Sequence, residues 1–315
     1  MEILPFVLLN GTLFGMLLFM LAAGLTLIYG MMGVINFAHA SFYMLGAYLG
    51  YQVSVWAGFW AGMIVVPVIL GLAGVAFRRV LISRLAIEDQ VGQLLVTFGA
   101  AMVITEGVQI VWGRLAVPYR IPQEMTGALF NVGGLDFPVY RFFILVVSVL
   151  LFAVILLILK RTRIGLILSA AQSKPQMVRA MGYDLDLVND WVFAAGVAVA
   201  GLAGVMAGNL LGVYPVMAER ITPLLFVIVV VGGLGSLNGA LIVALALGLI
   251  DTAATTYKLS AEPLVTALFG APERGTFLAD LARFNTTSFA PILPYLLMLI
   301  VLLIRPRGLF GQRDL

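Results

Sequence analysis

The stretch GMMGVINFAHASFYMLGAYLG, residues 30 to 50, decides how the chain folds, because it places polar side chains and glycines inside a long apolar region. It holds Asn36 and the only histidine of the chain, His39. Around it, the sequence between Glu2 and Arg78 has no Asp, Glu, Lys or Arg. As one helix that region would extend about 110 Å, against a bilayer core about 30 Å thick. It therefore predicts about three crossings of a membrane.

The composition of the whole chain agrees with a membrane protein. Hydrophobic residues make up 62% and charged residues 10% of the 315 positions, whereas soluble domains carry about 25% charged residues. Further apolar runs of helix length cover residues 91–112, 142–159, 191–218, 221–250 and 284–304. None alternates polar and apolar residues, which argues against a transmembrane β-barrel. We expect an all-α polytopic membrane protein with about eight or nine hydrophobic segments in a single transmembrane domain, residues 1–315.

A second glycine-rich stretch, VVGGLGSLNGALIVALALGL over residues 230–249, repeats a pattern of the first. Each places a glycine three residues before an asparagine. The run 221–250 is too long for one span and too short for two, so we expect broken half-helices that meet inside the bilayer. Such breaks at corresponding positions of two halves indicate a transport site with an inverted-repeat organisation. The candidate residues of the translocation pathway are Gly33, Asn36, His39, Gly232, Gly233, Gly235, Ser236 and Asn238.

For two polar residues, a structural role is an alternative to a role in transport. His39 is equally consistent with a neutral hydrogen-bond bridge between helices. Glu106 is the one carboxylate well inside a predicted span, but it lies near enough to the span's end to reach interfacial water. We predict no catalytic residue and no metal site, because one histidine without any cysteine offers little for nucleophilic catalysis.

The positions of the basic residues predict the orientation in the membrane. Clusters of Lys and Arg beside span ends mark the cytoplasmic side. They follow the third, fifth and last predicted spans, at Arg78, Arg79 and Arg84, at Lys160, Arg161 and Arg163, and at Arg305 and Arg307. We therefore expect the amino terminus outside and the carboxyl terminus inside.

Three long loops connect the predicted spans. Loop 114–141 lies outside and is rich in proline and glycine, which predicts an irregular excursion. Loop 253–290 also lies outside, and its TFLADLARF stretch, residues 276–284, is a candidate amphipathic surface helix. Loop 160–190 is cytoplasmic, with a short helix expected over 175–181, capped by Ser173 and closed by a left-handed Gly182. This short helix is either a simple connection or a handle that a soluble partner moves.

Five stretches together resemble the permease subunits of branched-chain amino acid type ABC importers, specifically the LivH-like subunit. They are GLTLIYGMMGVINFAHASFYMLGAY, TRIGLILSAAQSKPQMVRAMGYD, FAAGVAVAGLAGVMAG, VVVGGLGSLNGALIVALALGLID and LPYLLMLIVLLIRPRGLFG. The resemblance implies a multi-pass permease of the bacterial inner membrane that pairs with a second, LivM-like permease as a heterodimer. It also implies two cytoplasmic ATPases that bind ATP and Mg, a periplasmic solute-binding protein, and no cofactor in this chain. The ATPase-coupling positions that it implies are Arg163, Gly165, Ala171, Ala180, Gly182 and Asp184.

The chain departs from the family pattern at two places. Ala40 and Ser41 stand where the family usually has Gly and Glu, and residues 165–169 read GLILS where GRAxRA is usual. The ATPase contact is therefore expected to differ in detail, and the solute stays open among branched-chain amino acids, urea, short amides and aromatic acids.

The source of energy follows from what the sequence lacks. It has no GxxxxGK[ST] loop, the motif that binds ATP phosphates. Transport is therefore driven by ATP hydrolysis in another subunit, or it uses no energy source. A passive channel for a small neutral solute is the alternative function. An intramembrane enzyme lacks the necessary groups, and a purely structural subunit would leave the basic loop unexplained. The sequence indicates membrane lipid but no nucleic acid as a further partner.

Overall fold

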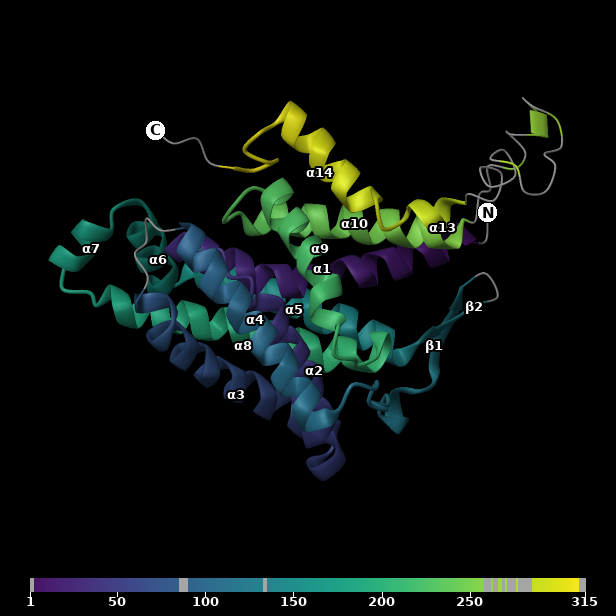
Figure 1. Ribbon diagram of the computed structural model, residues 1–315, viewed down its shortest axis with the longest axis horizontal. Coiled ribbons are helices and arrows are strands. Elements are labelled where there is room, and N and C mark those ends of the chain that lie inside the picture. The colour runs from purple at the N-terminus through teal and green to yellow at the C-terminus, as the bar shows by residue number, and fades with distance from the viewer. Residues whose placement is uncertain are drawn as a thin grey trace.

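The computed structural model describes residues 3–84, 90–132, 135–257 and 285–311, together with residues 262, 266, 267, 270 and 276. Its helices are labelled in Figure 1. They are α1 (Ile3–Met32), α2 (His39–Ala57), α3 (Phe59–Val80), α4 (Gln90–Trp112), α5 (Val139–Arg161), α6 (Arg163–Ser173), α7 (Pro175–Ala180), α8 (Leu185–Leu211), α9 (Met217–Gly232), α10 (Leu237–Thr256), α13 (Thr286–Phe289) and α14 (Leu293–Ile304). The stretch TFLADLARF lies almost wholly outside the described residues.

Six of the described helices are long and apolar enough to cross a membrane, namely α1, α3, α4, α5, α8 and α10. This confirms the expected all-α polytopic membrane protein. The helices α2, α9 and α14 complete the bundle (Figure 1). Helix α2 leads into α3, α9 leads into α10, and α14 leads into the carboxyl-terminal segment. The eight or nine segments expected from the sequence correspond to these helices only approximately.

Two predicted segments differ from the helices that form. The run 191–218 is replaced by α8, which starts earlier because the Asp184 carboxylate accepts hydrogen bonds from the Asp186 and Leu187 amides. The helix stops where Gly212 takes a φ of 85°, a left-handed conformation that favours glycine. The run 221–250 forms two helices, α9 and α10, as the expected break predicts, and they differ only in extending into the flanking sequence on each side of the glycine turn.

Helix α8 is the centre of the bundle and packs against α1, α2 and α3. Glycines allow this close approach. A Cβ atom on Gly46 of α2 would overlap the backbone of Gly201 in α8, and one on Gly24 of α1 would overlap the carbonyl of Gly196. Small residues at such crossings are the usual solution in membranes, where packing rather than water exclusion holds helices together.

The two ends of the bundle carry different structures (Figure 1). The short helices α6 and α7 lie at one end, and a hairpin of β1 (Ala128–Val132) and β2 (Leu135–Pro138) lies at the other. The expected irregular excursion over 114–141 is therefore wrong in part. Phe130 and Phe137 stack across the hairpin with their ring centroids 5.2 Å apart, which holds the two strands in register.

Candidate functional site

A re-entrant segment, residues 33–38, connects α1 to α2. Helix α1 ends at Met32, yet the Nε2 atom of His39 lies 3.1 Å from the carbonyl oxygen of Leu21, in the interior of α1. The segment thus carries the chain back along α1 before α2 begins. Polar side chains of the INFAH motif are placed in the middle of the bundle as a result.

Local hydrogen bonds explain why the segment takes this path. Gly33 has a φ of 64°, which turns the chain out of α1. The Asn36 side-chain oxygen accepts a hydrogen bond from the Ala38 amide at 3.0 Å and so supports the first turn of α2. The Phe37 amide donates to the Thr97 hydroxyl of α4 at 3.2 Å, and the Phe37 ring packs 4.5 Å from that of Phe226 in α9.

The re-entrant segment has unused hydrogen-bonding capacity. Asn36 and His39 are each 1% exposed. Among the described residues, the buried side-chain polar atoms without a partner are Asn36 Nδ2, His39 Nδ1, Tyr48 Oη and Asn209 Oδ1. Two of these four atoms lie on or directly after the segment. Because unpaired buried polar groups are costly, these two atoms are candidates for hydrogen bonds to a polar ligand.

The second glycine-rich break, residues 232–236, forms a tight turn between α9 and α10. Gly233 and Gly235 have φ values of 98° and 82°, and the Ser236 hydroxyl caps α10 by accepting from the Gly239 amide at 3.2 Å. The turn pairs with the carboxyl-terminal segment, because the Leu309 amide donates to the Val231 carbonyl at 2.8 Å. This places the turn beside the arginines that follow α14 instead of midway along a broken span.

The two breaks meet at one end of the bundle. A Cβ atom on Gly235 would lie 3.0 Å from the Cα atom of Gly30, and the Gln172 side chain of α6 donates a hydrogen bond to the Gly30 carbonyl. The two asparagines, however, are not equivalent. Asn36 is buried and Asn238 is exposed, so the structure does not bring the matching residues of the two motifs into one site.

The predicted coupling positions lie on α6, α7 and the turn before α8. Gly165 is required by packing, since a Cβ there would overlap the Leu159 carbonyl at the end of α5. Ala171 forms a small buried cluster with Val178 and Leu185, which ties the three helices together. Arg163 and Ala180 are exposed, as are Gly182, with a φ of 85°, and the capping residue Asp184.

The expected cap of α7 is wrong. Ser173 does not cap this helix, because its hydroxyl donates to the Ser169 carbonyl inside α6, and Lys174 occupies the cap position without a side-chain bond. The helix itself forms nearly as predicted, with proline in its first turn. Its outer face presents apolar side chains, with Met177 62% and Met181 74% exposed.

A buried ion cluster escaped the sequence reasoning. Arg78 and Asp190 are 5% and 4% exposed, and the Arg78 guanidinium bonds the Asp190 carboxylate and the Asp186 carbonyl. Arg79 bonds the other Asp190 oxygen at 2.7 Å. The cluster fastens the end of α3 to the start of α8. The sequence signal that could have revealed this cluster is Asp190, an acidic residue directly before the apolar run that begins at Trp191.

The hairpin end of the bundle also holds a buried tyrosine. Tyr119 accepts a hydrogen bond from the Ser54 hydroxyl at 3.3 Å, and the neighbouring Val117 pairs with Val213. Burial raises the pKa of the Tyr119 hydroxyl above its ordinary value, so the phenol stays neutral. These contacts fix the loop between α4 and the hairpin to α2 and α8.

Other sites of the molecule bear less on the pathway. Two grooves with volumes of about 680 and 530 Å³ lie beside α8, and neither is lined by a predicted pathway residue. Glu106 is exposed on α4. Among the described residues, no three histidine, cysteine or carboxylate side chains gather in a way that would hold a metal ion.

Comparison with known proteins identifies a family. The family described as "Branched-chain amino acid transport system / permease component" matches residues 7–302. The chain is 24% identical to the high-affinity branched-chain amino acid transport system permease protein LivH of Salmonella typhimurium, covering 97% of this chain and 94% of LivH. It is 25% identical to the permease protein BraD of Pseudomonas aeruginosa, covering 98% and 95%. A probable LivH of Methanocaldococcus jannaschii is 28% identical over 94% and 89%. No solved structure matches the chain.

Proposed function

The chain belongs to the family of permease components of branched-chain amino acid transport systems, and we propose that it moves such amino acids, or similar small solutes, inward across the membrane. It is a multi-pass protein of the inner membrane. The observation that carries the proposal is the family match over nearly the whole of a bundle whose interior holds the re-entrant segment 33–38.

Asn36 and His39 are the polar groups that the proposal assigns to the pathway. They are buried, each has one free polar atom, and both sit where α2 begins inside the bundle. A few such groups in an apolar route bind a passing solute only weakly. Weak binding suits a permease whose selectivity comes from a soluble receptor, because tight binding would slow release.

The coupling role is assigned to α6 and α7. Figure 1 shows these helices at one end of the bundle, opposite the end that carries the β1–β2 hairpin. Exposed Met177 and Met181 on α7 offer an apolar contact, and Gln172 connects α6 to the end of α1 next to the re-entrant segment. Motion of this element would thus reach the pathway through one hydrogen bond and the cluster around Ala171.

The assembly that we propose contains two cytoplasmic ATPases, with their ATP and Mg, on the α7 side. A periplasmic binding protein docks on the hairpin side, and a second, LivM-like permease completes the membrane unit. In this assembly the present chain supplies no catalytic residue and binds no cofactor. Its work is to open and close a route in response to the ATPases.

Reconstituted uptake tests the proposal. The permease, purified with the subunits encoded beside it, is placed in proteoliposomes with labelled leucine and the binding protein outside and ATP inside. We expect uptake against a gradient that stops when ATP is replaced by a non-hydrolysable analogue. Uptake that continues without the ATPases would identify a passive channel instead, and urea or short amides in the same assay would reveal another solute.

A further inference from the structure

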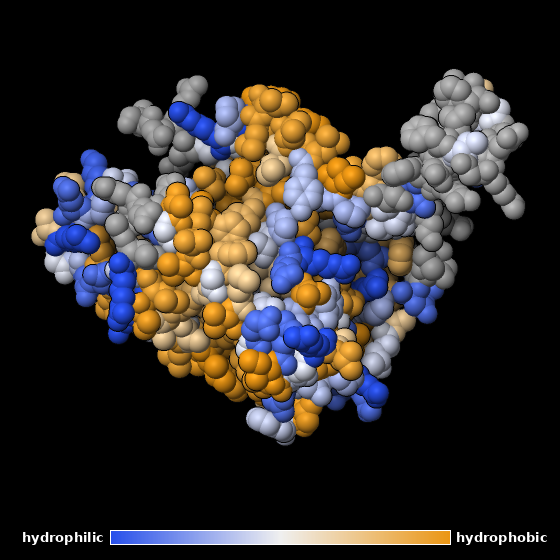
Figure 2. Space-filling view, viewed as in Figure 1, coloured by the Kyte–Doolittle hydropathy of each residue, from blue (hydrophilic) through white to orange (hydrophobic). Residues whose placement is uncertain are grey.

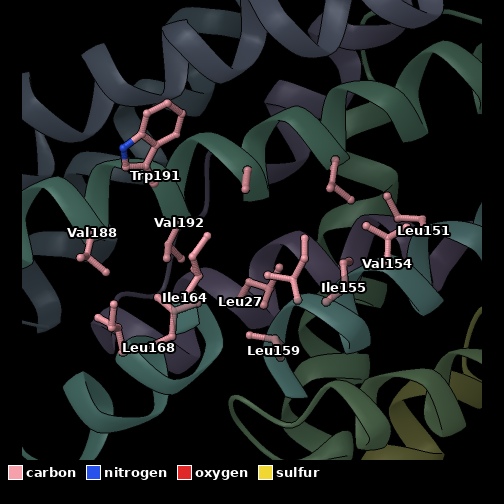
Figure 3. A pocket seen from close by; sticks show the side chains of 14 residues that line it. Leu27, Leu151, Val154, Ile155, Leu159, Ile164, Leu168, Val188, Trp191 and Val192 are labelled. Carbon is pink, nitrogen blue, oxygen red and sulfur yellow. The ribbon is translucent and has the colours of Figure 1, made fainter. Parts of the chain in front are cut away.

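The larger groove lies among α1, α5, α6 and α8, at the end of the bundle that carries the basic residues. Its volume, about 680 Å³, falls within the roughly 300–1,000 Å³ of pockets that take small ligands. In Figure 3, Val188 and Val192 of α8 lie opposite Leu168 and Ile164 of α6. Every side chain that lines the groove is apolar, apart from the indole nitrogen of Trp191. The groove therefore suits a hydrocarbon ligand.

The lining argues for a flexible chain rather than a protein helix. Helices that pack in membranes approach one another through small residues. The larger groove has a single small lining residue, Ala195, among leucine, isoleucine and valine side chains. The smaller groove, between α3 and α8, differs, because Gly71, Ala194 and Ala198 line it. Only the smaller groove has the composition of a helix-docking surface.

Positive charge stands at the inner end of the larger groove. Leu159 and Ile164 line it, and between them the chain carries Lys160, Arg161 and Arg163. These three residues are exposed, and within the described part of the chain none of them forms an ion pair. Lys and Arg at helix ends extend toward the headgroup layer and attract anionic lipids. Figure 2 shows the hydrophilic end of the molecule next to its apolar band.

From this combination we propose that the larger groove binds an anionic phospholipid of the inner leaflet. The acyl chains lie between α5, α6 and α8, and the phosphate lies among Lys160, Arg161 and Arg163. The lipid joins α6 to the two long helices beside it. Since α6 leads into α7, the occupancy of the groove affects the segment that is assigned to ATPase coupling.

Quenching of Trp191 fluorescence by brominated lipid tests this site directly. Trp191 is 71% exposed and lines both grooves, so the groove variants in the next paragraph are needed to assign its quenching to the larger one. The full-length protein is placed in nanodiscs of phosphatidylglycerol and phosphatidylcholine with identical chains, and one of the two lipids is brominated. The signal of Trp191 is the difference between the wild type and Trp191→Phe. We expect brominated phosphatidylglycerol to quench it at lower mole fraction, by about fivefold for each cation in contact.

Variants separate the headgroup and chain contributions. The triple variant Lys160→Gln, Arg161→Gln, Arg163→Gln should lose the preference, whereas Arg305→Gln with Arg307→Gln, at the same end of the bundle, should keep it. Val154→Phe partly fills the groove and should weaken quenching by both lipids. Val149→Phe lies on the same helix outside the lining and is the matched control.

Two results would overturn the proposal. Equal quenching of wild-type Trp191 by the two lipids would make the groove part of the ordinary lipid-facing surface. Absence of quenching by either lipid in the assembled transporter would mean that another subunit covers the groove. The wild-type comparison needs only the conservative Trp191→Phe subtraction, so misfolding of Val154→Phe or of the triple variant leaves the result readable, and it is independent of which solute is transported.

Discussion

At the scale of residues, the cluster of Arg78, Arg79 and Asp190 joins two helices through ion pairs with a buried carboxylate. It connects the end of α3 to the start of α8, immediately after the α7 segment. Removing one partner of a buried ion pair destabilises the folded protein strongly, because it leaves an uncompensated charge in the interior. The cluster therefore makes α3 and α8 a single unit next to the coupling segment.

Asp190→Asn should destabilise the protein by about 3 kcal/mol, because the buried Arg78 guanidinium then keeps only the exposed Asp186 carboxylate, 3.7 Å away, as a counter-charge. Thermal unfolding of the purified protein in detergent measures the loss. Asp186→Asn is the comparison within the same cluster: its carboxylate pairs with Arg78 only at 3.7 Å and is 76% exposed, so its loss should change stability little. An equal effect of both substitutions would contradict the assignment of the cluster as a structural clamp.

Gly165→Ala should displace α6 from the end of α5, since its Cβ would overlap the Leu159 carbonyl. We expect a loss of about 1–3 kcal/mol, typical of overpacking. Hydrogen exchange over residues 163–173 would report the displacement as faster exchange. Gly107→Ala has open space around it and is the matched control. Unchanged exchange in Gly165→Ala would show that the close approach is not needed.

At the scale of elements, two helix caps and one hydrophobic cluster fix α6 and α7 to the neighbouring helices. Thr162 caps α6 by accepting a hydrogen bond from the Gly165 amide, the cluster of Ala171, Val178 and Leu185 holds α7, and Asp184 caps α8. The single backbone hinge of this segment with positive φ is Gly182, which links α7 to α8. The geometry favours transmission of movement from α7 into the centre of the bundle.

Gly182→Val should uncouple ATP hydrolysis from transport while the permease stays folded. The substitution meets no steric obstacle but forces a β-branched residue to a φ of 85°, at a cost of about 1–2 kcal/mol. The turn is then expected to relax and shift α7. Stimulated ATPase activity and uptake are measured together in proteoliposomes. If both stay at wild-type levels, the turn has no part in coupling.

At the scale of the whole molecule, the bundle has two unlike ends joined by an apolar middle (Figure 2). The hairpin and the start of α1 lie at one end, and α6 and α7 lie at the other (Figure 1). The basic clusters at the carboxyl ends of α3 and α5 and directly after α14 all belong to the second end. By the rule that positive residues stay inside, we predict that this end faces the cytoplasm.

Single cysteines would test this orientation, because the natural chain contains none. Met181→Cys on α7 should react with a membrane-impermeant maleimide only in inside-out vesicles. Leu129→Cys on the hairpin, 46% exposed, should react only in right-side-out vesicles. The mirrored pattern would reverse the topology and place the coupling segment outside.

The sequence by itself determined the membrane class, the approximate spans, the short helix α7 and the left-handed turn at Gly182. These depend on composition, apolar run length and local backbone preference, which neighbouring residues set. Only the tertiary structure decided that segment 33–38 turns back beside Leu21, that the second break is a tight turn beside Leu309, and that Arg78 pairs with Asp190. Each of these joins residues far apart in the chain, and local sequence cannot fix such contacts because they arise only when packed helices bring their faces together.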